Sequence, residues 1–245
     1  MFLLHGLFGA SDNWHYIAQK LAENFHVFTP DLRNHGQSPH SATMDYPLMA
    51  GDVAEIMAAQ GLAGAYVIGH SMGGKVAMQL ALQFPERVEK LIVSDIAPRV
   101  YAPAHERIFK ALLALDLTAY SSRQPMEEVL EPDIPNLVLR RFLLKNLGRD
   151  SQGKFYWKMN LRGIWENYPK LAESLTTAKP FIGPTLFVRG GRSDYIQLGD
   201  ETLIHQIFPQ ARMETIPEAS HWVHADKPEE FLGLVRAFLC DIEAG

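Results

Sequence analysis

One stretch, Gly69-His70-Ser71-Met72-Gly73, constrains the fold of this sequence more than any other. It follows an apolar run at residues 65–68 and precedes a helical pattern with Val76, Ala77, Leu80, Ala81 and Phe84 on one stripe. Between a strand and a helix, G-x-S-x-G holds a serine at a strained turn at the carboxyl end of a sheet. A side chain at either glycine would collide with the strand or the helix. The same motif also fits a glycine-rich turn with a capping serine, so other parts of the sequence are needed to choose between these two interpretations.

Short apolar stretches alternate with helical patterns on both sides of this turn. We expect strands at residues 1–4, 26–30, 65–68, 91–95, 184–190 and 212–216. Helical patterns lie between them, at residues 46–60 and 199–208 for example, and a last amphipathic helix carries Phe231, Leu234, Val235 and Phe238. This alternation predicts an α/β fold with a mostly parallel sheet flanked by helices.

The alternation is interrupted between residues 97 and 182, where strand signals are weak. Helical stretches appear instead at residues 105–117, 126–130, 137–147 and 164–178, separated by prolines and carrying their own apolar residues. We therefore expect a core formed by residues 1–98 and 182–245, with a helical cap inserted at residues 99–181.

Composition excludes several classes of function. A net charge of −5 gives no electrostatic case for binding nucleic acid, and no apolar stretch approaches membrane-spanning length. The histidines and acids show no metal-site spacing such as H-E-x-x-H, so we expect no metal and no cofactor. The single Cys240 and the lack of a signal-peptide pattern in the first residues favour the cytoplasm.

Polar residues follow several of the expected strands. Open parallel sheets bind ligands at the carboxyl ends of their strands, where His5, Asp31, Ser71, Asp95, Ser193, Asp194 and His221 are expected. A serine hydroxyl needs a base to become a nucleophile, and a histidine base needs an orienting carboxylate. Ser71, an aspartate and His221 occur in an order compatible with this chemistry.

Five motifs together carry a family resemblance. They are His5-Gly6-Leu7-Phe8-Gly9, Asp31-x-Arg33-Asn34-His35-Gly36, Gly69-His70-Ser71-Met72-Gly73-Gly74-Lys75, Asp95-Ile96-Ala97-Pro98 and His221-Trp222-Val223-His224. With them the chain resembles the α/β-hydrolases, and among these the small YbfF-type esterases and their abhydrolase-domain relatives. The resemblance covers the whole chain, the cap more weakly, and implies the α/β-hydrolase fold. The family normally has two further antiparallel strands before the His-Gly strand, so either the start is truncated or the sheet is smaller.

Chemistry and resemblance assign the same roles to the site residues. Ser71 is the expected nucleophile and His221 the base that takes its proton. The backbone N–H groups of Met72 and Leu7 are expected to hold the oxyanion, with Phe8 as an alternative to Leu7. His5 and His35 are expected to brace the neighbouring loops.

Two aspartates compete for the role of orienting acid. Most α/β-hydrolases place the acid three residues beyond a glycine, which gives Ser193 counted from Gly190 and Asp194 counted from Gly191. The YbfF-type pattern has a serine at this place and takes its aspartate from the end of the previous strand, which is Asp95 here. We favour Asp95, with Ser193 assisting by a hydrogen bond and Asp194 as the alternative.

The function expected from these residues is a serine carboxylesterase that hydrolyses short to medium acyl esters of small molecules through an acyl-enzyme. An acyl-CoA thioesterase would use the same triad but needs a basic rim, for which Arg99, Arg140, Arg141, Lys145 and Arg149 are candidates. A catalytically silent binding module is a third reading, since fold does not fix function. The sequence leaves the oligomeric state open.

Overall fold

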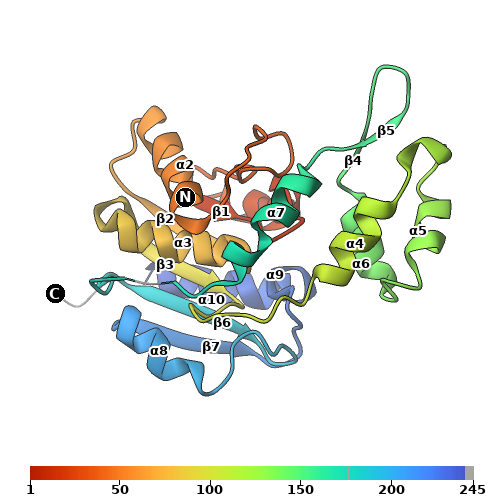
Figure 1. Cartoon of the computed structure of the whole chain (residues 1–245). Helices are drawn as coiled ribbons and strands as arrows, with labels where there is room; N and C mark the ends of the chain where they lie inside the picture. Colours follow the sequence, from red (N-terminus) through yellow and green to blue (C-terminus); the bar gives the residue numbers. More distant parts are fainter. Residues whose placement is uncertain (176, 241–245) are drawn as a thin grey trace.

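A parallel sheet organises the chain, in a computed structural model that describes residues 1–175 and 177–240. Its strands run in the order β1 (Phe2–Leu4), β2 (Ala65–His70), β3 (Val88–Ser94), β6 (Thr185–Gly190) and β7 (Ala211–Ile216). Every neighbouring pair is parallel. The predicted α/β architecture with a parallel sheet is confirmed (Figure 1).

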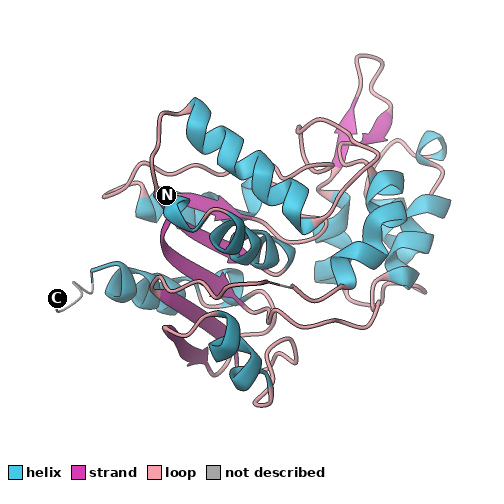
Figure 2. Ribbon diagram, turned by 60° about the vertical axis from the view of Figure 1, so that its left-hand side comes forward, coloured by secondary structure: helices cyan, strands magenta, loops and turns pink. Residues whose placement is uncertain are grey.

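Side chains alternate between the two faces of the sheet along each strand. Helices cover both faces, so both are buried. One face carries Leu3, Ile68, Ile92 and Val188, and the other carries Leu4, Val67, Leu91 and Phe187. The first face packs against α1 (His15–Leu21), α9 (Val223–Asp226) and α10 (Pro228–Cys240). The second packs against α2 (Tyr46–Ala59), α3 (Met72–Gln83) and α8 (Asp200–Ile207) (Figure 2).

Residues 99–181, which we call the insert, separate β3 from β6. They form α4 (Glu106–Ala114), α5 (Gln124–Leu130), α6 (Leu137–Leu144), the hairpin of β4 (Leu147–Arg149) and β5 (Phe155–Trp157), and α7 (Leu161–Ala172). In Figure 1, α4, α5 and α6 group together away from the sheet. The last helix returns to the core, where the Tyr46 hydroxyl on α2 donates to the Leu171 carbonyl at 2.6 Å. Short 3₁₀ helices occur at Ser11–Trp14, Pro85–Arg87 and Leu117–Ala119.

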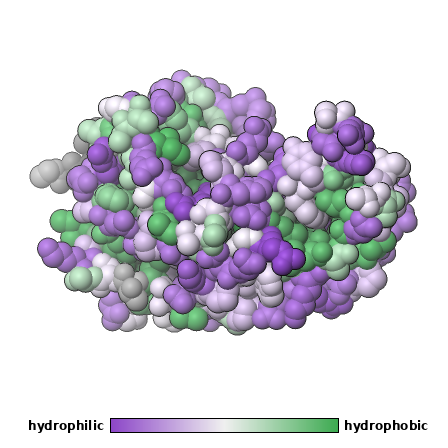
Figure 3. Space-filling view, turned by 45° about the horizontal axis from the view of Figure 1, so that its top comes forward, coloured by the Kyte–Doolittle hydropathy of each residue, from purple (hydrophilic) through white to green (hydrophobic). Residues whose placement is uncertain are grey.

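One buried apolar cluster runs from the core into the insert. It contains Phe8 and Met72 of the core together with Phe109, Leu112 and Tyr168 of the insert. Apolar side chains also reach the surface of the insert (Figure 3), and the large exposed ones among the described residues are Val100, Leu113, Val129, Leu137, Val138 and Tyr156. Within the described ranges, no helix has both the length and the apolar character needed to cross a membrane.

Two details differ from the expectations drawn from the sequence. Residues 26–30 form a single bridge, Phe2 to Phe28, in place of a strand. Pro30 has no N–H to extend that pairing. The predicted helix at residues 137–147 ends at Leu144, and the chain turns into the β4–β5 hairpin. Strands of three residues carry too little periodicity to be predicted.

Candidate active site

Ser71 lies at the sharp turn between β2 and α3. Its backbone has φ 54° and ψ −121°, a left-handed conformation that is strained for any residue with a side chain. A Cβ at Gly69 would lie 2.1 Å from the Gly73 carbonyl oxygen, and one at Gly73 would lie 2.3 Å from that of Leu4. The close approach of strand and helix therefore requires both glycines, as the motif predicted.

His221 lies between Ser71 and Asp95. Its Nε2 is 2.9 Å from the Ser71 Oγ, and its Nδ1 is 2.8 Å from the Asp95 Oδ2. Tyr195 stacks on the imidazole with ring centroids 3.7 Å apart, and His70 lies 2.8 Å from the His221 carbonyl through its Nε2. His221 is therefore held at both its ring and its backbone, and no sequence pattern indicated the Tyr195 contact.

Asp95 directly follows β3 and is fully buried. Gly190 donates its N–H to Oδ1 at 2.9 Å, and the Ser193 hydroxyl donates to Oδ2 beside the His221 contact. A buried carboxylate needs such donors to replace its hydrogen bonds to water. The structure thus brings Asp95, Ser193, His221 and Ser71 together.

Asp194 is exposed at the rim of the same region. Its backbone carbonyl accepts from Arg99 at 3.4 Å and from Gln197 at 3.4 Å. Within the described part of the chain, its carboxylate makes no contact with His221. Of the two alternatives for the acid, Asp95 is therefore buried beside His221, whereas Asp194 is exposed at the rim.

The loop after β1 offers backbone N–H groups beside Ser71. Phe8 has φ 59° and donates its N–H to His35 Nε2 at 3.3 Å, so this amide is already engaged. The Leu7 N–H has no protein partner within residues 1–175 and 177–240. Met72 is the first residue of α3, where helix geometry leaves the N–H free. Leu7 and Met72 are thus the available pair.

Two buried histidines brace this loop, as expected from the sequence. His5 accepts the Leu32 N–H at Nε2 (2.9 Å) and lies 2.9 Å from the Gly6 carbonyl through Nδ1. His35 accepts from Phe8 at Nε2 and lies 2.9 Å from the Arg33 carbonyl through Nδ1. Burial lowers the pKa of both, that of His35 to about 3. Each is therefore neutral, with a proton on Nδ1.

A cavity of about 300 Å³ opens beside Ser71. Its walls are mostly apolar or aromatic, as in sites for small molecules. The core contributes Leu7, Tyr46, Met72, Lys75 and Ile96, and the insert contributes Tyr101, His105, Tyr168 and Leu171. Core and insert thus share one cavity beside Ser71.

Lys75 lies in the wall of this cavity and is 1% exposed. Its ammonium donates to the backbone carbonyls of Arg99 (2.8 Å) and Glu173 (2.5 Å). The aromatic rings of Tyr101 and Tyr46 lie 4.9 and 5.4 Å from it. Burial, and then Arg99, lower its pKa to about 8. Sequence patterns gave no indication of these contacts.

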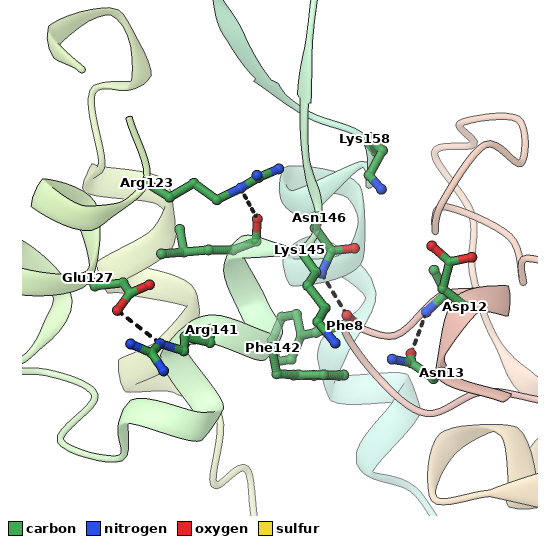
Figure 4. Close-up of a pocket in the computed structure, with 12 residues that line it drawn as sticks. Phe8, Asp12, Asn13, Arg123, Glu127, Arg141, Phe142, Lys145, Asn146 and Lys158 are labelled. Carbon is green, nitrogen blue, oxygen red and sulfur yellow. Dashed lines mark hydrogen bonds and ion pairs between the residues drawn. The ribbon is translucent and has the colours of Figure 1, made fainter. Parts of the chain in front are cut away.

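A second cavity of about 300 Å³ lies between the loop after Phe8 and the insert (Figure 4). Its charged lining residues are Arg123, Arg141, Lys145, Lys158, Asp12 and Glu127. Arg141 pairs with Glu127 at 3.2 Å, whereas the ammonium groups of Lys145 and Lys158 have no partner among the described residues. This wall carries a net positive charge.

The five cations considered for a basic rim therefore do not lie together. Arg141 and Lys145 line the second cavity, and Arg99 lines the first while pairing with Asp200 at 3.1 Å. Arg140 is buried on the carbonyls of residues 134 and 135, and Arg149 binds those of residues 121 and 153. Two of the five predicted cations thus reach the second cavity.

Comparisons with known proteins identify the family of the chain. The family model described as alpha/beta hydrolase fold matches residues 1–228. The sn-1-specific diacylglycerol lipase ABHD11 of Mus musculus is 38% identical over 244 residues, covering 96% of this chain and 79% of the relative. Esterase YbfF of Escherichia coli strain K12 is 37% identical over 242 residues, covering 98% of this chain and 92% of the relative.

Among solved structures, a marine microorganism esterase superposes with a TM-score of 0.94 at 42% sequence identity. The match covers 97% of this chain and 94% of that one. The resemblance to YbfF-type esterases inferred from the five motifs is confirmed. The chain therefore belongs to the alpha/beta hydrolase fold family.

Proposed function

We propose that this protein is a serine carboxylesterase that acts through an acyl-enzyme. The observation that carries the proposal is the continuous hydrogen-bonded chain from Ser71 Oγ through His221 to the buried Asp95. Family membership and the relatives named as esterases and lipases support the hydrolysis of ester bonds. The substrate is a small acyl ester that enters the cavity beside Ser71.

The first half of the reaction forms the acyl-enzyme. Asp95 accepts a hydrogen bond from the Nδ1–H group of His221, which keeps the proton on Nδ1 and leaves Nε2 unprotonated and facing the Ser71 hydroxyl. As Ser71 Oγ attacks the acyl carbon, its proton passes to Nε2. The carbonyl oxygen becomes an oxyanion that accepts from the N–H groups of Leu7 and Met72.

Collapse of the tetrahedral intermediate breaks the bond to the alcohol oxygen. The leaving alcohol takes the proton from His221 Nε2, and the acyl group remains on Ser71 as an ester. A water molecule then gives its proton to Nε2 and attacks the acyl carbon. The second collapse returns that proton to Ser71 and releases the carboxylic acid.

Asp95 is our choice for the orienting acid, with Ser193 assisting. Its burial, its 2.8 Å contact with Nδ1 and its two further donors, the Gly190 N–H and the Ser193 hydroxyl, support this role. Asp194 is exposed and bonded through its backbone carbonyl. Its carboxylate lies at the rim of the cavity.

We propose that residues 99–181 act as the cap of the site. Insert residues Tyr101, His105 and Tyr168 line the same cavity as Ser71. A cavity of about 300 Å³ is at the lower end of the usual size for ligand sites, which supports short to medium acyl chains. The single cysteine supports a reducing compartment, and we propose the cytoplasm.

An acyl-CoA thioesterase is the second candidate. The ammonium groups of Lys145 and Lys158, unpaired among the described residues, form with Arg141 a basic wall that suits phosphate groups (Figure 4). A panel of acyl esters and matched acyl-CoA thioesters separates the two. Higher kcat/KM for the thioesters, lost when Lys145 and Lys158 are both changed to Ala, would favour this candidate.

Labelling by a fluorophosphonate tests the mechanism directly. We expect the wild type to be labelled at Ser71 and to hydrolyse para-nitrophenyl butanoate. Ser71→Ala should lose both properties and keep the circular dichroism spectrum and melting temperature of the wild type. Appreciable ester hydrolysis by a folded Ser71→Ala variant would refute the nucleophile, and an unlabelled, inactive wild type would favour a binding module.

A further inference from the structure

The tautomer of His105 is set by Tyr168, and both residues line the cavity beside Ser71. The His105 backbone N–H donates to the Tyr168 hydroxyl oxygen at 3.2 Å, and this oxygen lies 2.8 Å from His105 Nδ1. Among the described residues, the Tyr168 hydroxyl proton has no acceptor other than this ring nitrogen. The hydroxyl therefore donates its proton to His105 Nδ1.

His105 is consequently an acceptor at Nδ1 and, when neutral, carries its proton on Nε2. Burial, and then the nearby His221, lower its pKa to about 4, so the ring is neutral at ordinary pH. No acceptor for the Nε2 proton occurs in the described part of the chain. This N–H is a fixed donor with no partner of its own.

The ring is held in place on the side of the cavity formed by the insert. It packs edge-on against Phe8, with centroids 6.1 Å apart, and against Tyr168 at 5.8 Å. Phe8 is the neighbour of Leu7, whose N–H faces the oxyanion. The charge of His221 is close enough to affect the His105 pKa. His105 is thus positioned near the reacting ester but outside the hydrogen-bonded chain of Ser71, His221 and Asp95.

Three other polar side chains of the cavity are already engaged. The Tyr46 hydroxyl donates to the Leu171 carbonyl at 2.6 Å. The Tyr101 hydroxyl accepts the Ala97 N–H at 2.8 Å and donates to the Tyr195 carbonyl at 2.5 Å. Lys75 donates to two backbone carbonyls. In a mostly apolar cavity, a fixed neutral donor constrains where a polar atom of the substrate can lie.

We propose that His105 Nε2–H donates a hydrogen bond to an acceptor oxygen of the substrate other than those of the reacting ester. This inference rests on the proposed esterase function and narrows its substrate class to esters that carry an ether, keto or hydroxyl oxygen. Such an oxygen belongs either to the acyl group or to the leaving alcohol. An oxygen buried here without a donor would lose its hydrogen bond to water, and His105 restores it.

Two pairs of isosteric esters test the proposal and separate the two sources. The acyl pair is para-nitrophenyl methoxypropanoate and para-nitrophenyl pentanoate. The alcohol pair is methoxyethyl butanoate and butyl butanoate. In each pair an ether oxygen replaces one methylene group. The measured quantity is the oxygen preference, the ratio of kcat/KM for the ether to that for the alkyl ester, compared between variants so that intrinsic reactivity cancels.

We expect His105→Phe to lower the oxygen preference roughly five- to tenfold in one of the two pairs, the effect of losing a single hydrogen bond. His105→Gln should restore most of it, because the amide N–H of glutamine reaches the place of Nε2. The exposed His205→Phe on α8 is the matched control and should leave the preference unchanged. An oxygen preference that is the same in wild type, His105→Phe and His105→Gln for both pairs would overturn the proposal.

The tautomer can be measured independently of activity. We expect the ¹⁵N spectrum of the Ser71→Ala protein to show His105 with an unprotonated Nδ1 and a protonated Nε2, and Tyr168→Phe to shift this balance. A proton on Nδ1 would remove the proposed donor. If the wild type hydrolyses neither ester pair, the esterase function fails while the spectrum still reports the tautomer, so the two failures are distinguishable.

Discussion

The ammonium of Lys75 donates a 2.5 Å hydrogen bond to the backbone carbonyl of Glu173, 98 residues further along the chain. The Arg99 carbonyl accepts from the same group at 2.8 Å. These carbonyls belong to the two ends of the insert, whereas the Lys75 N–H bonds the Ser71 carbonyl one helical turn back at 3.1 Å. One side chain therefore ties α3, the helix that follows Ser71, to both ends of the insert.

The buried charge of Lys75 should make stability depend on pH in a distinctive way. Its folded pKa of about 8 lies below the ordinary 10.5, so the unfolded chain binds more protons between these values and stability rises with pH there. Relative to Lys75→Met, the wild type should gain on the order of 2 kcal/mol of unfolding free energy between pH 7 and pH 10. Urea unfolding of both proteins at the two pH values measures this. An unchanged difference would mean that Lys75 titrates normally.

The two candidate acids should respond differently to amidation. Asp95→Asn should lower kcat by about 10⁴, because the amide favours the wrong tautomer of His221. Asparagine tolerates the positive φ of 51° at this position, so the backbone should survive. Asp194→Asn should remain near wild type, since that carboxylate does not meet His221. Kinetics with para-nitrophenyl butanoate compare the two, and the reverse pattern would exchange the assignments.

The size of the cavity predicts a limit on acyl length. Each added methylene should raise kcat/KM until the space of about 300 Å³ is filled, and longer chains should then lose activity. A series of para-nitrophenyl esters from acetate to palmitate measures the profile. A steady rise through the long-chain esters would show that the cavity opens into a channel.

His224 should contribute to loss of stability in acid. It is buried, stacks on Trp14 with centroids 4.2 Å apart, and has a pKa lowered to about 3, first by burial and then by His221. The unfolded chain binds a proton near pH 6.5, so the wild type loses stability as pH falls below that value. His224→Phe should lose less, by on the order of 2 kcal/mol between pH 6.5 and pH 5. Parallel acid dependences in chemical unfolding would show that His224 does not contribute.

Local sequence patterns predicted those features of the fold that depend on residues close together in the sequence. The glycines around Ser71 predicted the turn. A Cβ at Gly69 would lie 2.1 Å from a backbone carbonyl oxygen and one at Gly73 would lie 2.3 Å from another, so each position requires glycine. Continuous apolar runs predicted the central strands because both faces of the sheet are buried there. Asp95 could be preferred only through the family resemblance, since nothing in its own neighbourhood indicates that it will meet a histidine 126 residues away.

The remaining features depend on how distant segments meet. The Lys75 contacts join residues 24 and 98 positions apart, and the His105 tautomer depends on a tyrosine 63 positions away. Neither the Lys75 contacts nor the His105–Tyr168 pair produces a periodic pattern in the sequence. The bridge at Phe28 and the hairpin around residues 147–157 are too short for strand patterns to develop.

The unbroken apolar cluster from Phe8 and Met72 to Phe109 and Tyr168 makes core and insert a single cooperative unit. Detaching the insert would expose these side chains to water, at a cost that grows with their area. The walls of the cavity should therefore melt together with the sheet, in one calorimetric transition. Thermal inactivation would then report global unfolding, and a substitution anywhere along this cluster would shift the temperature at which activity is lost.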